Sequence, residues 1–191
     1  EAFDRRSAFI RGQRTTPMKR IVLIYGLIAG VNVSAMMWLT LGSGQHDFDN
    51  GELIGYTTMV IAFVTIFFGV KAHRERQGGA ITFGKAFLVG LGITLVASTL
   101  YVASWMLMSA TTDQDFMQAY YEHTKEKLES SGAPAEEVEA ELAKLRYFGE
   151  LYKNPVVKIA FTYMEILPVG LFFSLLFAVI LRRKADAVAA G

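Results

Sequence analysis

The sequence predicts an all-α polytopic membrane protein with four transmembrane helices and an extracytoplasmic amphipathic helical hairpin between spans three and four. Hydrophobic residues make up 52% of the 191 residues, and they are concentrated in four long blocks with few or no charges. Each block is close to the roughly 20 residues that a helix needs to cross a hydrocarbon core. Only helices and closed barrels satisfy their backbone hydrogen bonds in lipid, and blocks of this length are helical. The predicted spans are residues 21–41, 53–70, 86–112 and 156–181.

Lys and Arg residues predict the orientation of these spans. Six precede span one, four lie between spans two and three, and three follow span four. The segment between spans one and two contains Asp47, Asp49 and Glu52 without any Lys or Arg, and residues 113–155 contain ten acidic and five basic residues. Basic flanking segments stay in the cytoplasm. We therefore expect a multi-pass protein of the bacterial cytoplasmic (inner) membrane with its N-terminus and C-terminus in the cytoplasm.

The ends of the chain fall outside the predicted membrane domain, which covers residues 18–184. Residues 1–17 are predicted to be a disordered basic extension, because Met18-Lys19-Arg20 directly before span one resembles a natural start, and residues 185–191 form a C-terminal tail. Span one is not predicted to be a cleaved signal peptide. Its apolar stretch exceeds the usual 7 to 15 residues, and no Ala-x-Ala site follows it.

Residues 113–155 are predicted to form the outer hairpin, because a structureless loop of this length is uncommon. Ser130-Ser131-Gly132 ends the first helix, and Pro134 suits the first position of the second. Two interpretations remain open. The hairpin is either a lid whose apolar stripes pack on each other and on the bundle, or an outer docking surface for a lipid, a protein partner or a second copy. The residues proposed for that docking surface are Phe116, Tyr120, Phe148 and Tyr152.

Glu165 is the only charged residue in the apolar run of span four, from Ile159 to Leu181, and an ionisable group in hydrocarbon is costly unless it is paired or protonated. It lies roughly 9 Å inside the outer end of the apolar run that starts at Ile159, at 1.5 Å per residue. Pro168 removes a backbone hydrogen bond one turn later. Residues at a similar depth in other spans complete a candidate intramembrane polar site. These are Asn32, Tyr56 and Tyr101. Four further polar residues have a similar depth: Thr57, Thr58, Ser98 and Ser104.

The sequence leaves two roles open for Glu165 and disfavours a third. It could be a structural hydrogen-bonding group that connects helices, or a carboxylate that binds a proton or a cation. Catalysis is disfavoured, because one glutamate provides no arrangement of nucleophile, base and orienting group. The sequence therefore predicts no catalytic residue and no enzymatic activity.

Other chemical classes are also disfavoured. The chain has no cysteine, which excludes thiolate metal sites. His46, Asp47, Asp49 and Glu52 form an ordinary acidic loop without zinc-site spacing, so neither a metal nor a cofactor is predicted. The net charge is only +1, and no nucleic-acid-binding motif is present. The expected partners are the lipid bilayer and either a further copy of the chain or an envelope protein.

Small residues recur every four positions on three spans, a spacing that lets helices approach closely. They predict either packing within one chain or seams between two chains. The rows are Gly26, Gly30 and Ser34; Gly90, Thr94 and Ser98; and Gly170, Ser174 and Ala178.

Several short motifs occur in an order that resembles the bacterial membrane family known as domain of unknown function (DUF) 4199, over about residues 18–184. They are Gly51-Glu52-Leu53-Ile54-Gly55-Tyr56, His73-Arg74, Ile81-Thr82-Phe83-Gly84-Lys85-Ala86-Phe87, Tyr101-Val102 with Trp105, Asp115-Phe116, Tyr152-Lys153-Asn154-Pro155, and Thr162-Tyr163-Met164-Glu165-Ile166-Leu167-Pro168-Val169-Gly170-Leu171. His73-Arg74 departs from the family, which typically has Tyr-Arg there.

The resemblance implies a four-span bacterial membrane protein without an assigned activity, in which Glu165 and Pro168 belong to the family pattern. Two hypotheses for function follow. The first is a non-enzymatic integral protein of the cell envelope that binds a partner or a lipid. The alternative is a small proton- or cation-coupled transporter, or a channel-like protein, that uses Glu165.

Overall fold

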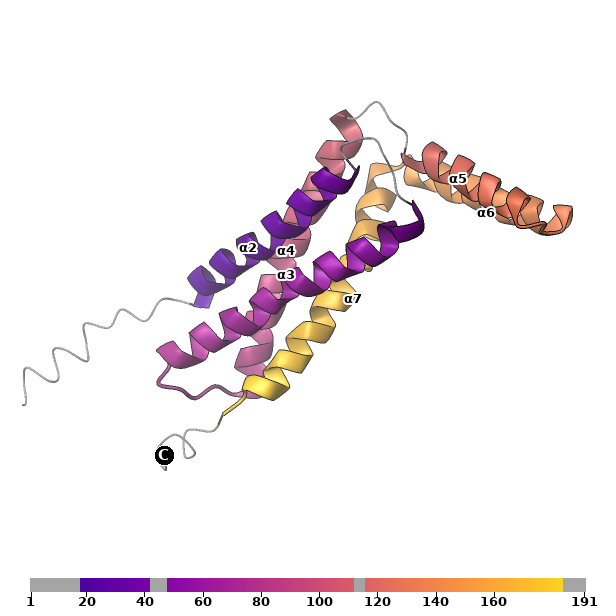
Figure 1. Ribbon diagram of the computed structural model, residues 1–191. Coiled ribbons are helices and arrows are strands. Elements are labelled where there is room, and N and C mark those ends of the chain that lie inside the picture. Colours follow the sequence, from indigo (N-terminus) through magenta and orange to yellow (C-terminus); the bar gives the residue numbers. More distant parts are fainter. Residues whose placement is uncertain (1–17, 42–47, 112–115, 184–191) are drawn as a thin grey trace, which may run out of the picture.

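The computed structural model describes residues 18–41, 48–111 and 116–183, and these residues form six α-helices (Figure 1). The helices are α2 (Met18–Leu41), α3 (Phe48–Arg76), α4 (Phe83–Thr111), α5 (Phe116–Ser130), α6 (Ala135–Tyr152) and α7 (Pro155–Leu181). Four segments are long and apolar enough to cross a membrane: Met18–Leu41, Leu53–Arg76, Phe83–Thr111 and Pro155–Leu181. The predicted fold class, an all-α protein with four spans, is confirmed. The predictions for residues 1–17, 185–191 and the loop around His46 and Asp47 concern residues outside those described.

The four long helices form a bundle in which α3 and α4 each contact all three of the others. Helices α2 and α7 therefore lie on opposite sides of the bundle. Its core is made of side chains with no exposed surface, including Phe63, Ile66, Ile93 and Ile166. No hydrophobic driving force acts between transmembrane helices, because lipid tails are as apolar as the side chains. Close packing of side chains and backbones therefore holds the spans together.

The rows of small residues are used inside the chain. A Cβ atom on Gly26 would lie 2.6 Å from Val96 Cβ, and one on Gly30 would lie 2.9 Å from Leu100 Cβ, so these glycines let α2 approach α4. Between α4 and α7, the Thr94 hydroxyl donates to the Gly170 carbonyl at 3.2 Å. The rows serve intramolecular packing in this structure.

One end of the bundle carries most of its basic side chains, and we call it the basic end. The α3–α4 connection and the end of α7 meet there (Figure 1). Ile81 and Arg183 exchange two backbone hydrogen bonds of 3.0 and 2.9 Å, and the Arg74 guanidinium donates to the Leu181 carbonyl at 3.4 Å. The described Lys and Arg residues near this end are Lys19, Arg20, Lys71, Arg74, Arg76, Lys85, Arg182 and Arg183.

Helices α5 and α6 pack on each other as a hairpin that extends sideways from the opposite end, which we call the hairpin end (Figure 1). Gly132, with φ +74°, provides the left-handed conformation at the turn between them. The Arg146 guanidinium joins the two helices by donating to the Tyr121 hydroxyl at 2.7 Å. Pro134 precedes α6 at the N-cap instead of occupying the first helical position. Asn154 caps α7, accepting a hydrogen bond from Val156 N at 2.9 Å.

Candidate functional site

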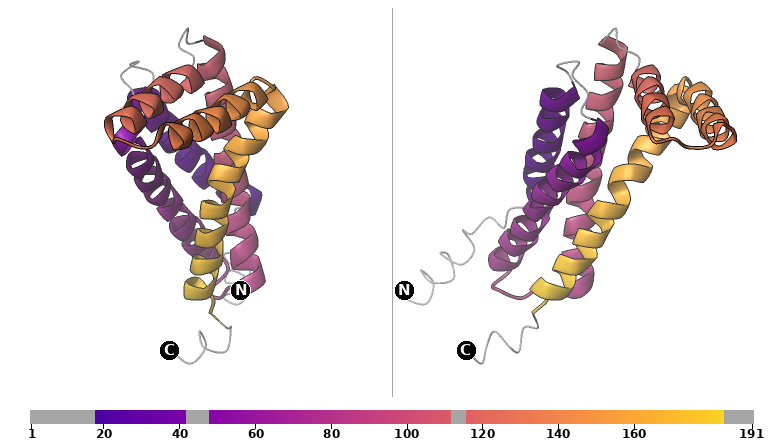
Figure 2. Two further views of the ribbon diagram at one scale, coloured as in Figure 1. Left: turned by 90° about the vertical axis from the view of Figure 1, so that its right-hand side faces the viewer. Right: turned by 45° about the vertical axis from the view of Figure 1, so that its right-hand side comes forward.

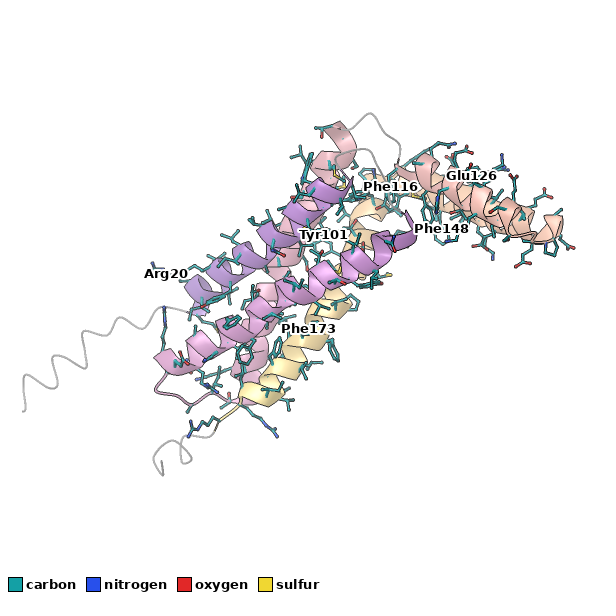
Figure 3. The ribbon with its side chains drawn as sticks, viewed as in Figure 1. Arg20, Tyr101, Phe116, Glu126, Phe148 and Phe173 are labelled. Atoms are coloured by element: carbon teal, nitrogen blue, oxygen red, sulfur yellow. The ribbon has the colours of Figure 1, made fainter. Side chains whose placement is uncertain are left out.

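A cavity of about 740 Å³ lies at the hairpin end of the bundle, and all six helices contribute to its lining. One lining residue from each helix, in chain order, is Val33, Gly55, Tyr101, Phe116, Phe148 and Glu165. Figure 3 shows Phe116 and Phe148 at the junction between bundle and hairpin, with Tyr101 farther inside the bundle. The cavity therefore lies where the spans meet the hairpin.

The cavity exists because α3 and α7 diverge. In the half of the bundle toward the basic end they touch through aromatic pairs, with ring centroids 6.3 Å apart for Phe63–Phe173 and 5.6 Å apart for Phe67–Phe177. Toward the hairpin end the two helices separate, and the hairpin crosses above them (Figure 2). Ile54 on α3 and Phe161 on α7 both line the cavity and are exposed. The cavity thus opens sideways between these helices, while the packed core closes it below.

The hairpin is attached to the bundle mainly around Trp105. This side chain is only 7% exposed, and its indole N–H donates to the Tyr152 hydroxyl at 2.9 Å. Its ring also meets Phe116 edge to face, with centroids 5.5 Å apart. A second edge-to-face pair joins Phe148 of α6 to Phe161 of α7 at 6.1 Å. These contacts hold the roof of the cavity in place.

Tyr152, at the end of α6, stays a neutral phenol. Burial raises the pKa of Tyr152 above its ordinary value, and the nearby Glu165 carboxylate raises it further. Hydrogen bonding with Thr162 and Trp105 acts in the opposite direction on the pKa, because it stabilises the phenolate. Since burial is the largest effect, the Tyr152 hydroxyl retains its proton at neutral pH and accepts the hydrogen bond from Trp105.

Most hydroxyl groups around the cavity are already engaged. Thr40, Thr58 and Thr162 each donate to a carbonyl of their own helix, at 2.9, 2.8 and 2.8 Å. By contrast, the described residues give Glu165 neither an ion pair nor a hydrogen bond, and they give the Tyr101 hydroxyl no hydrogen bond. The described lining contains no Lys, Arg or His. A single carboxylate without a cationic partner is therefore the main chemical feature of an otherwise apolar and aromatic cavity.

The profile of the family described as "Protein of unknown function (DUF4199)" matches residues 24–183. The chain belongs to the DUF4199 family. This confirms the resemblance predicted from the short motifs, and the matched region includes most of α2, the other three spans, the hairpin and all cavity-lining residues named above. Comparison of this DUF4199 chain with curated proteins and with solved structures finds no match.

The two sites proposed from sequence meet in the cavity of this DUF4199 protein. Glu165 and Tyr101, from the intramembrane polar site, line it together with all four residues of the proposed outer docking surface: Phe116, Tyr120, Phe148 and Tyr152. Because α7 begins at Pro155, Glu165 lies roughly 15 Å along the helix axis from the start of α7. The hairpin residues thus roof a site whose acid lies within the membrane.

Other predicted residues lie elsewhere. Asn32, Tyr56 and Pro168 are exposed and are not among the described lining residues. Ser98 is buried in the bundle, where its hydroxyl has no hydrogen-bond partner among the described atoms.

Trp105 and Gly55 were not proposed as site residues from sequence, although both line the cavity. Trp105 could have been found, since it follows Tyr101 by four positions and so shares its helix face.

Proposed function

We propose that this multi-pass membrane protein is non-enzymatic and binds a lipid, or another amphipathic molecule of similar size, in the cavity at its hairpin end. The observation that carries the proposal is the cavity itself, which is mostly apolar and aromatic, contains one carboxylate without an ion-pair partner among the described residues, and opens sideways between two spans. Its volume of about 740 Å³ falls within the range of sites that hold small ligands. One carboxylate in an aromatic lining supports binding better than catalysis, which needs several cooperating polar groups.

The alternative is proton- or cation-coupled transport through Glu165. It is favoured by the unpaired carboxylate, but transport also requires a route to the other side of the membrane. Below the cavity that route would pass Phe63, Ile66 and Ile93, which have no exposed surface. Proton or cation flux in proteoliposomes that is abolished by Glu165→Gln would favour transport and overturn a role limited to binding.

We further propose that the protein lies in a bacterial inner membrane with the basic end in the cytoplasm. The support is the concentration of the described Lys and Arg residues near that end, in the short segments that flank the spans. Both termini would then be cytoplasmic, and the cavity would face the outer leaflet. Reporter fusions after Arg76 and after Ser131 should report opposite sides of the membrane; reports from the same side would contradict this topology.

Filling the cavity from Gly55 should prevent a chain from entering it. A Cβ atom at Gly55 would meet no atom within 4 Å, and Gly55 lines the cavity, so Gly55→Phe is expected to place a ring in the cavity. The readout is Trp105, made the only tryptophan by Trp38→Phe, in nanodiscs whose lipids carry bromine on one acyl chain. Since Trp105 is buried against the protein, strong quenching requires a chain inside the cavity. We expect quenching in this background and its loss after Gly55→Phe.

The matched control is Gly84→Phe in the same background. Gly84 is exposed at the basic end, and a Cβ there also meets nothing within 4 Å. It should leave the quenching unchanged, because the added ring is far from the cavity. Absence of quenching in the starting protein, or equal quenching in the two glycine variants, would contradict the proposal.

A further inference from the structure

The polar groups of the cavity indicate the chemistry of its ligand. The lining threonines donate to their own helices, so they contribute little to recognition. Glu165 remains, accessible from the cavity and without a counterion among the described residues. A carboxylate at this depth is stabilised only by a cation, a hydrogen-bond donor or a proton. A ligand that brings a positive charge would meet this need directly.

The nearest cation on the same helix does not satisfy Glu165. Lys158 lies seven residues away, roughly 10 Å along the axis of α7. Its ammonium instead lies over the ring of Tyr152, 5.4 Å from the centroid. This contact shows that the aromatic wall at the cavity edge accepts an ammonium group, as expected for the face of an aromatic ring. Glu165 itself is left for another cation.

Aromatic rings accompany Glu165. Tyr101 and Tyr152 line the same cavity as Glu165, and Phe161 lines it one turn earlier on α7. A carboxylate beside aromatic rings is the combination by which proteins recognise ammonium ligands. An anionic ligand would be repelled by the Glu165 carboxylate, and a neutral ligand offers it at most a hydrogen-bond donor without a compensating charge.

The rest of the ligand must be apolar. Met37, Met59 and Leu41 line the cavity, and flexible methionines accommodate chains of irregular shape. The side opening between α3 and α7 is bordered by exposed Ile54 and Phe161 and faces the position of the lipid chains. An apolar chain can therefore leave the cavity into the bilayer without crossing the protein.

We propose that the cavity binds an ammonium-bearing amphiphile, with the ammonium beside Glu165 and the apolar chain extending through the opening between α3 and α7. This inference rests on the proposed binding function and specifies its ligand class. It gives Glu165 a binding role, and it explains why a carboxylate lies in an aromatic cavity that opens to lipid.

The test compares three single-chain amphiphiles that share one brominated tail and end in a primary ammonium, a hydroxyl or a carboxylate. Each is titrated against Trp105 fluorescence in the Trp38→Phe protein, in zwitterionic nanodiscs without bromine, and corrected for partition into empty nanodiscs. We expect the ammonium compound to bind at least about tenfold more tightly than the hydroxyl compound, since hydrogen bonds between charged groups are the stronger class. The carboxylate compound should bind most weakly.

Glu165→Gln should remove the preference for ammonium while the hydroxyl compound still quenches, which shows that the cavity has remained intact. Glu126→Gln is the matched control, because it removes the same charge from an exposed position on the hairpin, away from the bundle (Figure 3). It should preserve the preference.

Two negative results differ in meaning. If all three compounds quench equally, binding in the cavity stands and the ammonium inference is wrong. If none quenches, the proposed binding function itself is wrong.

Discussion

Replacement of Gly170 by leucine is expected to destabilise the bundle by roughly 3 kcal/mol, near the upper end of the usual cost of overpacking. A Cβ atom at Gly170 would overlap Thr94 Cγ2 and lie 3.0 Å from Phe63 Cζ. Thr94 is β-branched and has little rotamer freedom in a helix, and Phe63 is fully buried. The added side chain must therefore push α7 away from α4 and α3. The free energy of unfolding, measured by SDS titration in mixed micelles, checks this.

A matched glycine separates steric overlap from helix propensity. Gly84→Leu adds the same side chain where a Cβ meets nothing within 4 Å, so it should be neutral or stabilise by up to about 1 kcal/mol. The pair Gly170→Ala and Thr94→Ala provides a second check. Thr94→Ala removes the atom that the new Cβ would overlap, so the double variant should be more stable than the sum of the single effects predicts. Simple additivity would contradict the proposed contact.

The four spans could be predicted because lipid requires long, uncharged and helical segments, which the composition of each block reveals directly. The start of α3 was less predictable. The candidate span starts at Leu53, as predicted, but the helix that contains it begins earlier, at Phe48, since a helix can continue through polar residues once it leaves the hydrocarbon.

The candidate site could be predicted only in part. The sequence gives the depth of a residue in the membrane, but it does not give the direction in which its side chain points. Depth follows from counting residues at 1.5 Å each, and this placed Tyr101 near Glu165. Direction depends on how each helix is rotated by its packing, which a single span does not reveal. Asn32 and Tyr56 have suitable depth but are exposed on their helices. The position of the hairpin, which brings Phe148 over the cavity, depends on contacts between distant residues.

Trp105→Ala is expected to detach the hairpin from the bundle while the spans stay packed. The change removes a large side chain that is only 7% exposed, together with its hydrogen bond to Tyr152 and its ring contact with Phe116. Deleting a buried tryptophan typically costs about 3–5 kcal/mol. Here the loss falls on the junction, since α5 and α6 otherwise contact mainly each other and the start of α7. Hydrogen exchange in nanodiscs should rise across α5 and α6 and remain slow around Phe63.

Two comparisons make this result specific to the junction. Trp38, the other tryptophan of the chain, is 40% exposed, so Trp38→Ala should leave exchange in the hairpin unchanged. Trp105→Phe retains a ring but loses the N–H donor, and it should increase hairpin exchange by only the roughly fivefold that a loss of about 1 kcal/mol allows. If Trp105→Ala instead raises exchange equally in all six helices, the hairpin and bundle unfold as one unit. The cavity would then be a rigid pocket, and its roof could not move independently to admit a ligand.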